Sequence, residues 1–434
     1  MLVNKNILYF TAMLALLIFV GFYQSWNVSL SILNMCLISA VMALGVNIQW
    51  GYAGLFNVGI MGFAALGGLA AVLISMPPVE GAWDAGGWGI ISGLTLGILS
   101  LFFAVLTYKK LEKGYIRTIS ILLICLIGFF VSKYVLTPSK EAVESINPAA
   151  SGYLGGFGLP IILSWPVGGI FAGLAAWIIG KITLGLRSDY LAIATLGISE
   201  IIISILKYED WMTRGVKNVI GMPRPVPFEI NLQNTEWFTE LTIYLNLDII
   251  TFSTIFVKLC YACLFLSTLL ILLWLSETAL KSPWGRMMRA IRDNEVSANA
   301  MGKNITKKHL QVFILGSVVV GISGAMLTTL DGQLTPTAYQ PLRFTFLIWI
   351  MVIIGGSGNN WGSVLGGFII WFFWVESEPM GLFLMNLITS GMAEDNNLKL
   401  HLIESAAHMR LMTMGLILLL VLRFSPRGIL PEKS

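Results

Sequence analysis

The sequence predicts an all-α, polytopic integral membrane protein, and two observations lead to that fold. Of the 434 residues, 56% are hydrophobic and only 12% are charged, about half the charged share of an ordinary soluble domain. The apolar residues form uncharged runs of roughly 16 to 22 residues, long enough for a helix to cross a bilayer and too long for the strands of a membrane barrel. Because backbone polar groups cannot stay unpaired in lipid, each run is expected to be a helix.

About twelve apolar segments follow one another and form a single transmembrane domain over residues 1–434. The first follows Lys5 as in a signal peptide, but it is long and no small-residue cleavage site follows, so we expect it to stay as a helix. The segments 342–355 and 361–375 are short, so one or both are expected to be broken or re-entrant. The ranges are 6–24, 28–48, 55–75, 88–107, 117–136, 159–180, 189–206, 253–276, 309–330, 342–355, 361–375 and 405–423.

Charges between the segments predict the orientation of the chain. Lysine and arginine gather in alternate loops, above all in 109–117 and 277–308, whereas the intervening loops hold mostly acidic residues. Cytoplasmic loops of membrane proteins carry the excess of positive charge. Both termini and 277–308 are therefore expected in the cytoplasm, and the long polar loop 207–252 is expected on the outer, periplasmic side.

Motifs for catalysis or metal binding are missing from the sequence. Gly180-Lys181 is followed by Ile182 rather than Ser or Thr, so the chain lacks the phosphate-binding loop of ATPases. The four cysteines lie in apolar runs, where packing is a commoner role than a disulfide or a metal ligand. A net charge of +4 is too small to indicate nucleic acid as a partner. We expect no catalytic residue, no metal site and no cofactor bound by the chain itself.

Two glycine-rich breaks interrupt the apolar sequence, one beginning at Gly51 and one at Gly355. Irregular backbone near membrane depth is tolerated where it is buried in protein or lines a cavity. The breaks are therefore candidates for a solute path or gate. The alternative is a tight cytoplasmic turn in which glycine supplies a positive φ. The two breaks also echo one another, as the halves of an inverted repeat do. The candidate path or gate residues in the breaks are Tyr52, Asn57, Ser357, Asn359 and Asn360.

Further candidates for the path lie in the segment 189–206, where Thr195, Ser199 and Glu200 stand among apolar residues. A carboxylate within a span is unfavourable in lipid and usually faces an interior path or a partner. The alternative for Glu200 is a place near the outer end of the helix, where its side chain reaches the interface or caps a neighbour. An interior Glu200 would be the one group suited to coupling with an ion or a proton.

The cytoplasmic loop 277–308 carries the most informative pattern in the chain. Apolar residues at positions 287, 288, 291, 296 and 300 mark one side of a helix, and charged residues occupy the rest of it. A basic amphipathic helix of this kind lies on anionic lipid or docks in a groove of a cytoplasmic partner. The composition alone leaves both alternatives open.

Four stretches together resemble the branched-chain amino acid permease subunits of bacterial ABC importers, the LivM type. They lie at 51–59, at 186–201 (Leu186-Arg-Ser-Asp-Tyr-Leu-Ala-Ile-Ala-Thr-Leu-Gly-Ile-Ser-Glu-Ile201), at 285–302 and at 316–367, and the tail 423–430 also fits. The resemblance covers most of residues 30–75 and 160–430. It implies that 285–302 is the loop by which such permeases contact their ATPase. The residues of that coupling loop would be Arg289, Arg292, Asp293, Glu295, Ala298, Ala300 and Gly302.

The resemblance also implies the partners and the activity. The chain would pass a small polar solute, by family default a branched-chain amino acid, across the bacterial inner membrane. It would work with a second, homologous permease subunit, a periplasmic solute-binding protein and two ATPase subunits that hold ATP and Mg²⁺, all within or beside membrane lipid. Other amino acids, urea and small amides remain alternatives for the solute.

The chain departs from the family pattern in three places: 77–158, 213–221 and the long region 376–404. The first contains an extra pair of apolar segments, so we expect an inserted helical pair that does not line the path. Two other classes of protein remain as alternatives. An ion-coupled secondary transporter would need coupling groups within its spans, and a membrane enzyme would need a polar catalytic cluster at the interface.

Overall fold

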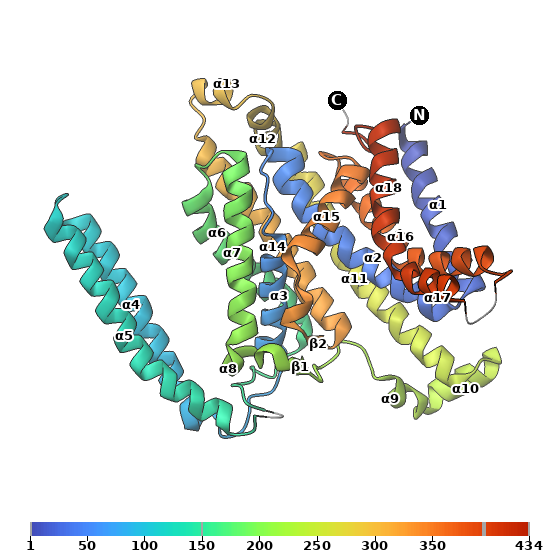
Figure 1. Ribbon diagram of the computed structural model, residues 1–434, viewed down its shortest axis with the longest axis horizontal. Coiled ribbons are helices and arrows are strands. Elements are labelled where there is room, and N and C mark those ends of the chain that lie inside the picture. Colours follow the sequence, from blue (N-terminus) through green and yellow to red (C-terminus); the bar gives the residue numbers. More distant parts are fainter. Residues whose placement is uncertain (1, 149–150, 393–395, 433–434) are drawn as a thin grey trace.

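A computed structural model describes residues 2–148, 151–392 and 396–432 of the chain (Figure 1). In this part the secondary structure is almost wholly helical, and the only strands are the short antiparallel pair β1 (Val219–Ile220) and β2 (Gln333–Leu334). Ten of its helices are long and apolar enough to cross a membrane, and two shorter apolar helices accompany them. The prediction of an all-α, multi-pass membrane protein is confirmed.

Each of the twelve apolar segments corresponds to a helix. The two shorter helices are α3 (Ile60–Ser75) and α15 (Pro341–Gly355). The others are α1 (Leu2–Tyr23), α2 (Trp26–Val46), α4 (Trp88–Lys110), α5 (Tyr115–Ser145), α6 (Ser164–Thr183), α7 (Ser188–Tyr208), α11 (Ile249–Lys281), α14 (Ile305–Asp331), α16 (Asn360–Ile388) and α18 (Met409–Phe424).

Several predicted boundaries were wrong. The segment 361–375 is not a short or broken helix, because it belongs to α16, which continues for 29 residues. The opposite error occurs at 55–75, where residues 54–59 have no regular structure and the helix begins only at Ile60. The segment 342–355 is short as expected, since α15 has 15 residues.

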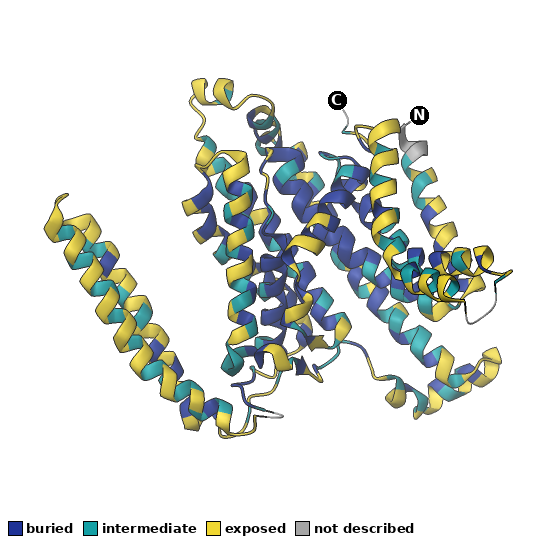
Figure 2. Ribbon diagram, viewed as in Figure 1, coloured by how far each residue is buried: buried dark blue, intermediate teal, exposed yellow. Residues whose placement is uncertain are grey.

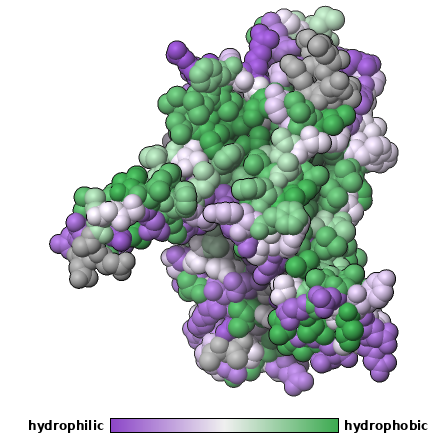
Figure 3. All heavy atoms as spheres, turned by 90° about the vertical axis from the view of Figure 1, so that its right-hand side faces the viewer, coloured by the Kyte–Doolittle hydropathy of each residue, from purple (hydrophilic) through white to green (hydrophobic). Residues whose placement is uncertain are grey.

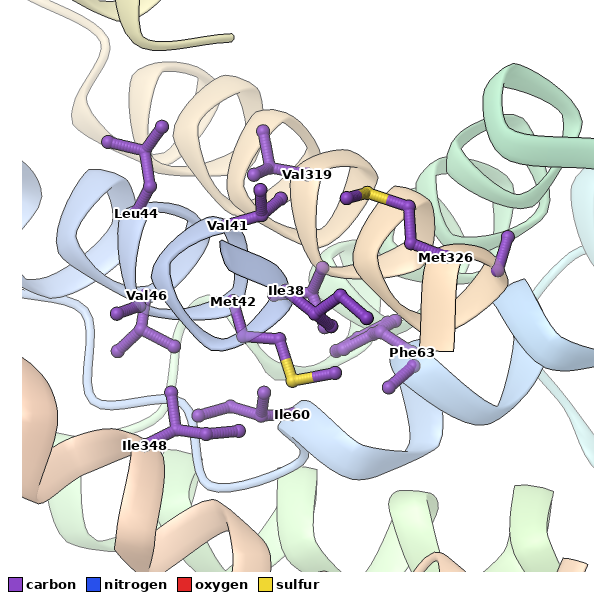
Figure 4. Packing of buried hydrophobic residues seen from close by; sticks show 14 of the residues in the cluster. Ile38, Val41, Met42, Leu44, Val46, Ile60, Phe63, Val319, Met326 and Ile348 are labelled. Atoms are coloured by element: carbon purple, nitrogen blue, oxygen red, sulfur yellow. The ribbon is translucent and has the colours of Figure 1, made fainter. Parts of the chain in front are cut away.

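The core of the bundle is formed by α2, α3, α6, α11, α14, α15 and α16 (Figures 2 and 4). Small residues let these helices approach closely, as is common in membranes. A Cβ atom at Gly67 of α3 would collide with the carbonyl oxygen of Gly321 in α14, and one at Gly324 would collide with the carbonyl of Ala64. Close backbone contact therefore fixes α14 between its neighbours.

Two broken-helix units make up the centre of this core. In the first, α2 ends in a π-helical turn (Asn47–Gly51), and the irregular residues 54–59 lead into the short α3. In the second, α14 is followed by β2 and the turn Pro336–Ala338, which lead into the short α15. The units run in opposite directions, because α2 ends at the end of the molecule where α14 begins (Figure 1). The break that matches 54–59 is thus 332–340, not the glycines near 355.

The loops gather at two opposite ends of the molecule. Both termini lie at the same end as α12 (Pro283–Asp293) and α13 (Glu295–Ala300), whereas α8 (Asp210–Thr213), α9 (Glu229–Gln233), α10 (Glu236–Leu245) and the strands lie at the other (Figure 1). The two ends carry hydrophilic residues, and apolar residues cover much of the face between them (Figure 3). Loops 207–252 and 277–308 are therefore on opposite sides; that the second faces the cytoplasm stays a prediction.

Helices α4 and α5 form a hairpin that stands apart from the bundle (Figure 1). It contacts the rest of the chain at its base, through a small cluster of Ala82, Ile90, Val143 and Leu154 and through an ion pair between Lys140 and Glu209. Above the base its residues are mostly exposed (Figure 2). The predicted extra pair of 77–158 thus has the shape of a separate arm, and its status as an insertion stays a prediction.

Candidate functional site

The amphipathic loop forms two helices rather than the single one that its pattern predicts. Pro283 occupies the first turn of α12, a position that needs no N–H donor. Asn294 leaves the helical conformation, and its side chain caps α13 by accepting a hydrogen bond from the Ser297 N–H at 2.9 Å. The predicted apolar face is therefore divided: Met288 and Ile291 are buried within this chain, and Val296 and Ala300 are exposed.

Arg292 turns from α12 into the protein, where it joins three segments. Its guanidinium donates to the carbonyl oxygen of Gly51 and forms ion pairs with Glu432 at 2.9 Å and with Asp293 at 3.1 Å. Although burial alone would lower it, hydrogen bonds from Arg292 to Glu432 and Asp293 hold the pKa of Arg292 above its usual value. The predicted loop residue Arg292 is thus a fixed positive charge that ties α12 to the first glycine break.

The two glycine breaks meet at Asn47. Its side-chain oxygen accepts from the Gly358 N–H at 2.9 Å, and its amide donates to Asn360 at 3.0 Å. Asn360 in turn donates to Glu277 at the end of α11, at 3.1 Å. The packing leaves no room for a side chain at Gly51, where a Cβ would meet the Gly358 nitrogen. The two breaks, joined by residues 311 positions apart in the sequence, form one buried polar site.

The C-terminal tail completes this site. The backbone of the tail pairs with the α15–α16 turn: Ile429 donates to Ile354 at 2.9 Å, and Leu430 donates to Gly355 at 3.0 Å. Asn359 adds hydrogen bonds from its amide to the carbonyl oxygens of Leu430 and Pro431. Glu432 is thereby placed beside Arg292, and we call the joined residues Asn47, Glu277, Arg292, Asn360 and Glu432 the junction.

The irregular residues 54–59 are held by a second set of polar contacts. Asn57 donates to Gln49 at 2.8 Å, and Gln49 donates to the Phe313 carbonyl at 2.9 Å and to Ser317 at 3.0 Å. Thr195 accepts from the Val58 N–H at 3.1 Å. Asn57 and Thr195 are therefore brought together, and the non-helical backbone is buried in protein, the condition under which it is tolerated at membrane depth.

The remaining predicted residues lie beside these contacts or away from them. Tyr52 is buried beside the junction, and burial raises the pKa of its phenol above the usual range. Ser199 packs against Gly62, and Ser357 is half-buried in the α15–α16 turn. Glu200 is exposed on α7 and borders an open groove that Lys207 and Arg343 also line. It is not buried inside this chain, so only an assembly could enclose it.

The tip of the loop carries the other predicted coupling residues. Asp293, Glu295 and Ala300 are exposed there. The Nη1 atom of Arg289 lies 4.0 Å from the Oε1 atom of Glu432. Ala298 is partly buried against the core. Gly302 has a φ of +74°, so it ends α13 in the left-handed conformation that glycine adopts readily, as its position after the helix predicts.

Sequence reasoning missed three members of the junction, namely Asn47, Glu277 and Glu432. Asn47 and Gln49 had a usable signal, because two amides inside an apolar run need buried partners. Glu277 and Glu432 gave none, since a carboxylate at a helix end or in a tail is ordinarily solvated.

Buried broken helices of opposite direction, joined to an amphipathic loop at one end, are the architecture of a membrane transport protein. Comparison with known families agrees: the model of the family described as branched-chain amino acid transport system / permease component matches residues 147–422. The chain belongs to this family. The α4–α5 hairpin lies outside the matched range, as do α1, α2 and α3.

Individual relatives are distant. The chain is 27% identical over 36% of its length to a Methanocaldococcus jannaschii protein described as "Probable branched-chain amino acid transport permease protein LivM", covering 42% of that protein. It is 22% identical to the LivM permease of Escherichia coli, over 49% of this chain and 50% of that one. The fructose import permease FrcC of Rhizobium meliloti is 27% identical over 28% of this chain and 34% of its own. The chain thus spans half or less of these relatives, and no solved structure matches it.

Proposed function

We propose that this chain is a permease subunit of an ABC importer that passes a branched-chain amino acid across the bacterial inner membrane. ATP and Mg²⁺ would be held by two ATPase subunits, and a second permease subunit and a periplasmic solute-binding protein would complete the complex. Membership of the permease family supports a transport role, and the names of the LivM relatives support the solute.

The observation that carries the coupling role is the contact between Arg292 and the Gly51 carbonyl. A partner that presses on α12 and α13 moves the guanidinium, which is bonded to the break after α2 and to the tail beside α15. The loop is therefore joined by one charged side chain to the first glycine break directly, and to the second glycine break through the C-terminal tail. Hydrogen bonds to charged groups are the stronger kind, so the connection suits the transmission of a displacement.

The docking surface would be the tip of α13. Val296 and Met301 are 81% and 79% exposed there, whereas the apolar residues Met288 and Ile291 are engaged in the core of this chain. The exposed pair supplies apolar anchors, and the charges of Asp293 and Glu295 surround them. A few buried anchors with an orienting charged rim are typical of protein interfaces.

An ion-coupled secondary transporter receives less support. Such a protein would need an ionisable group in the interior of its spans. Glu200, the residue on which that alternative depends, is exposed on the surface of this chain, and Asp331 at the end of α14 is exposed as well. The alternative would also leave the connection from α13 to the junction without a role.

The test uses the complete complex in proteoliposomes and two variants. Val296→Asp puts a charge at the docking tip and should reduce both recovery of the ATPase subunits and ATP-driven uptake by at least about tenfold. Val216→Asp, at the opposite end and 53% exposed, is the matched control and should leave both unchanged. Arg292→Ala should leave ATPase recovery intact and lower uptake, because docking is separate from transmission. Equal recovery and equal uptake in all three would refute the coupling role.

A further inference from the structure

A cavity of about 200 Å³ lies where the two broken-helix units meet. Ile38 and Met42 reach it from α2, Met61 from α3, and Ile348 from α15. The segment that links α14 to α15 closes another side with residues 333–339. Ile38, Met42 and Ile348, which line the cavity, are labelled in the packed core in Figure 4. In membrane transporters, the interface between two interrupted units of opposite direction is the usual place for a solute site.

The lining is mainly aliphatic and sulfur-containing. Met35, Met42, Met61 and Met351 contribute four thioether side chains, which are flexible and polarizable and adapt to apolar groups of different shape. The leucine and isoleucine side chains complete an apolar wall. An aliphatic group of a bound molecule would be removed from water here without leaving a polar group unpaired.

Three polar groups on the same lining lack partners. The Thr335 hydroxyl and the Trp371 indole N–H are buried without a hydrogen bond from any described residue. The carboxylate of Asp331, an exposed residue on the same lining, has no ion pair within the described chain. An indole N–H only donates and a carboxylate only accepts. These three groups supply one negative charge and two donors, which suit a molecule that carries both charges.

We propose that this cavity binds the transported solute as a zwitterionic α-amino acid with an aliphatic side chain. The ammonium group pairs with Asp331, the carboxylate accepts from Trp371 and Thr335, and the side chain lies among the methionines. This inference rests on the proposed function and names the residues that select its solute. A sugar fits less well, because its many hydroxyls would be buried against an apolar wall without partners.

The experiment measures uptake of leucine and of alanine by the complete complex in proteoliposomes. Asp331→Asn removes the charge and should raise the KM for both amino acids by about tenfold or more, the loss expected for a charge-assisted hydrogen bond. Ser39→Leu adds a side chain to the lining and should reduce leucine uptake more than alanine uptake, because it shortens the apolar space. The matched controls are Glu240→Gln on α10 and Ser267→Leu on the exposed side of α11. They should change neither the KM values nor the ratio of leucine uptake to alanine uptake.

The outcomes separate the cavity from the proposed function. If the wild-type complex takes up no amino acid, the proposed function fails. If the wild type transports both amino acids and Asp331→Asn and Ser39→Leu match it, the cavity is not the solute site. A variant that does not assemble is identified by loss of the ATPase subunits. In that case Trp371→Phe, which keeps an aromatic ring and removes the indole N–H, is measured in place of the unassembled variant. An unchanged KM for both amino acids in Trp371→Phe overturns the proposal.

Discussion

Helix α2 and the α4–α5 hairpin are comparably apolar, but they occupy opposite environments. In the most apolar stretch of α2 with its π turn, 78% of the residues are buried inside the protein, against 17% for α4 and none for α5. Hydropathy therefore identifies residence in the membrane and leaves open whether a helix faces protein or lipid. The distinction lies in the polar and small residues that each segment carries.

Polar residues on α2 and its π turn reach other helices. Asn34 donates to the Lys258 carbonyl at 3.0 Å, and Asn47 and Gln49 bond across the core. In the hairpin, by contrast, Ser132 of α5 donates to the Gly93 carbonyl of α4 at 2.7 Å. Along its length, the hairpin thus pairs its hydroxyl groups and packs its glycines internally. It is a self-contained unit joined to the rest at one end.

Aromatic and basic residues mark the two ends of the hairpin. Trp88 is 69% exposed near the base, and Tyr108 and Tyr115 are exposed near the tip. The Arg117 guanidinium lies 4.8 Å from the centre of the Tyr108 ring. Exposed aromatics at both ends of an apolar segment are typical of helices in contact with lipid. We infer that lipid surrounds the hairpin, whereas protein surrounds α2.

The largest expected difference between core and hairpin concerns their glycines. Gly67→Ala should destabilise the protein by roughly 1–3 kcal/mol, because the new Cβ meets the Gly321 carbonyl and the packed backbones cannot both stay in place. Gly97→Ala should have little effect, since its Cβ would lie 3.2 Å from a Ser132 hydroxyl that can rotate and alanine favours the helix. Thermal unfolding in detergent measures the stability of both variants. Equal shifts of the unfolding temperature would contradict the difference between core and hairpin.

A smaller effect is expected when the hairpin is removed. Pro78 and Gly155 form a β-bridge, and Val79 donates to the Leu154 carbonyl at 3.2 Å, so the two ends of the arm are adjacent. A short polar linker in place of residues 82–152 should therefore leave the bundle intact. We expect the complex to assemble and to retain most of its ATP-driven uptake. Complete loss of uptake in a complex that still contains the ATPase subunits would show that the hairpin belongs to the transport machinery.

The sequence could predict the helices, because apolar runs of spanning length have few alternatives in lipid. It also located Gly51 and Gly355, since glycine clusters interrupt those runs. The meeting of Asn47 with Asn360 was beyond prediction, because it depends on how two distant breaks fold onto each other. The division of the coupling loop at Asn294 was missed for a different reason. The apolar spacing continues across Asn294, where α12 ends and α13 begins. Only the ability of asparagine to cap a helix indicates that the helix is interrupted there.

The smallest expected effect concerns the basic tip of the hairpin. Lys109 and Lys110 at the end of α4 and Lys113 in the link to α5 are exposed, at the end that we expect to face the cytoplasm. Each contributes about 1 kcal/mol of attraction to anionic headgroups. Changing all three to glutamine should reduce the enrichment of phosphatidylglycerol over phosphatidylcholine around the purified protein, measured by mass spectrometry of co-purified lipid.

The control for this change keeps the charge and alters the side chain. With arginine at all three positions, the enrichment should stay at the wild-type level, since the attraction depends on charge rather than on the ammonium group. Uptake should be the same in the glutamine and arginine variants, because the tip makes no contact with the junction or with the cavity. An unchanged lipid preference in the glutamine variant would mean that the anionic headgroups bind elsewhere. A loss of uptake in that variant alone would instead connect the hairpin to transport, and the separation between arm and core would then be wrong.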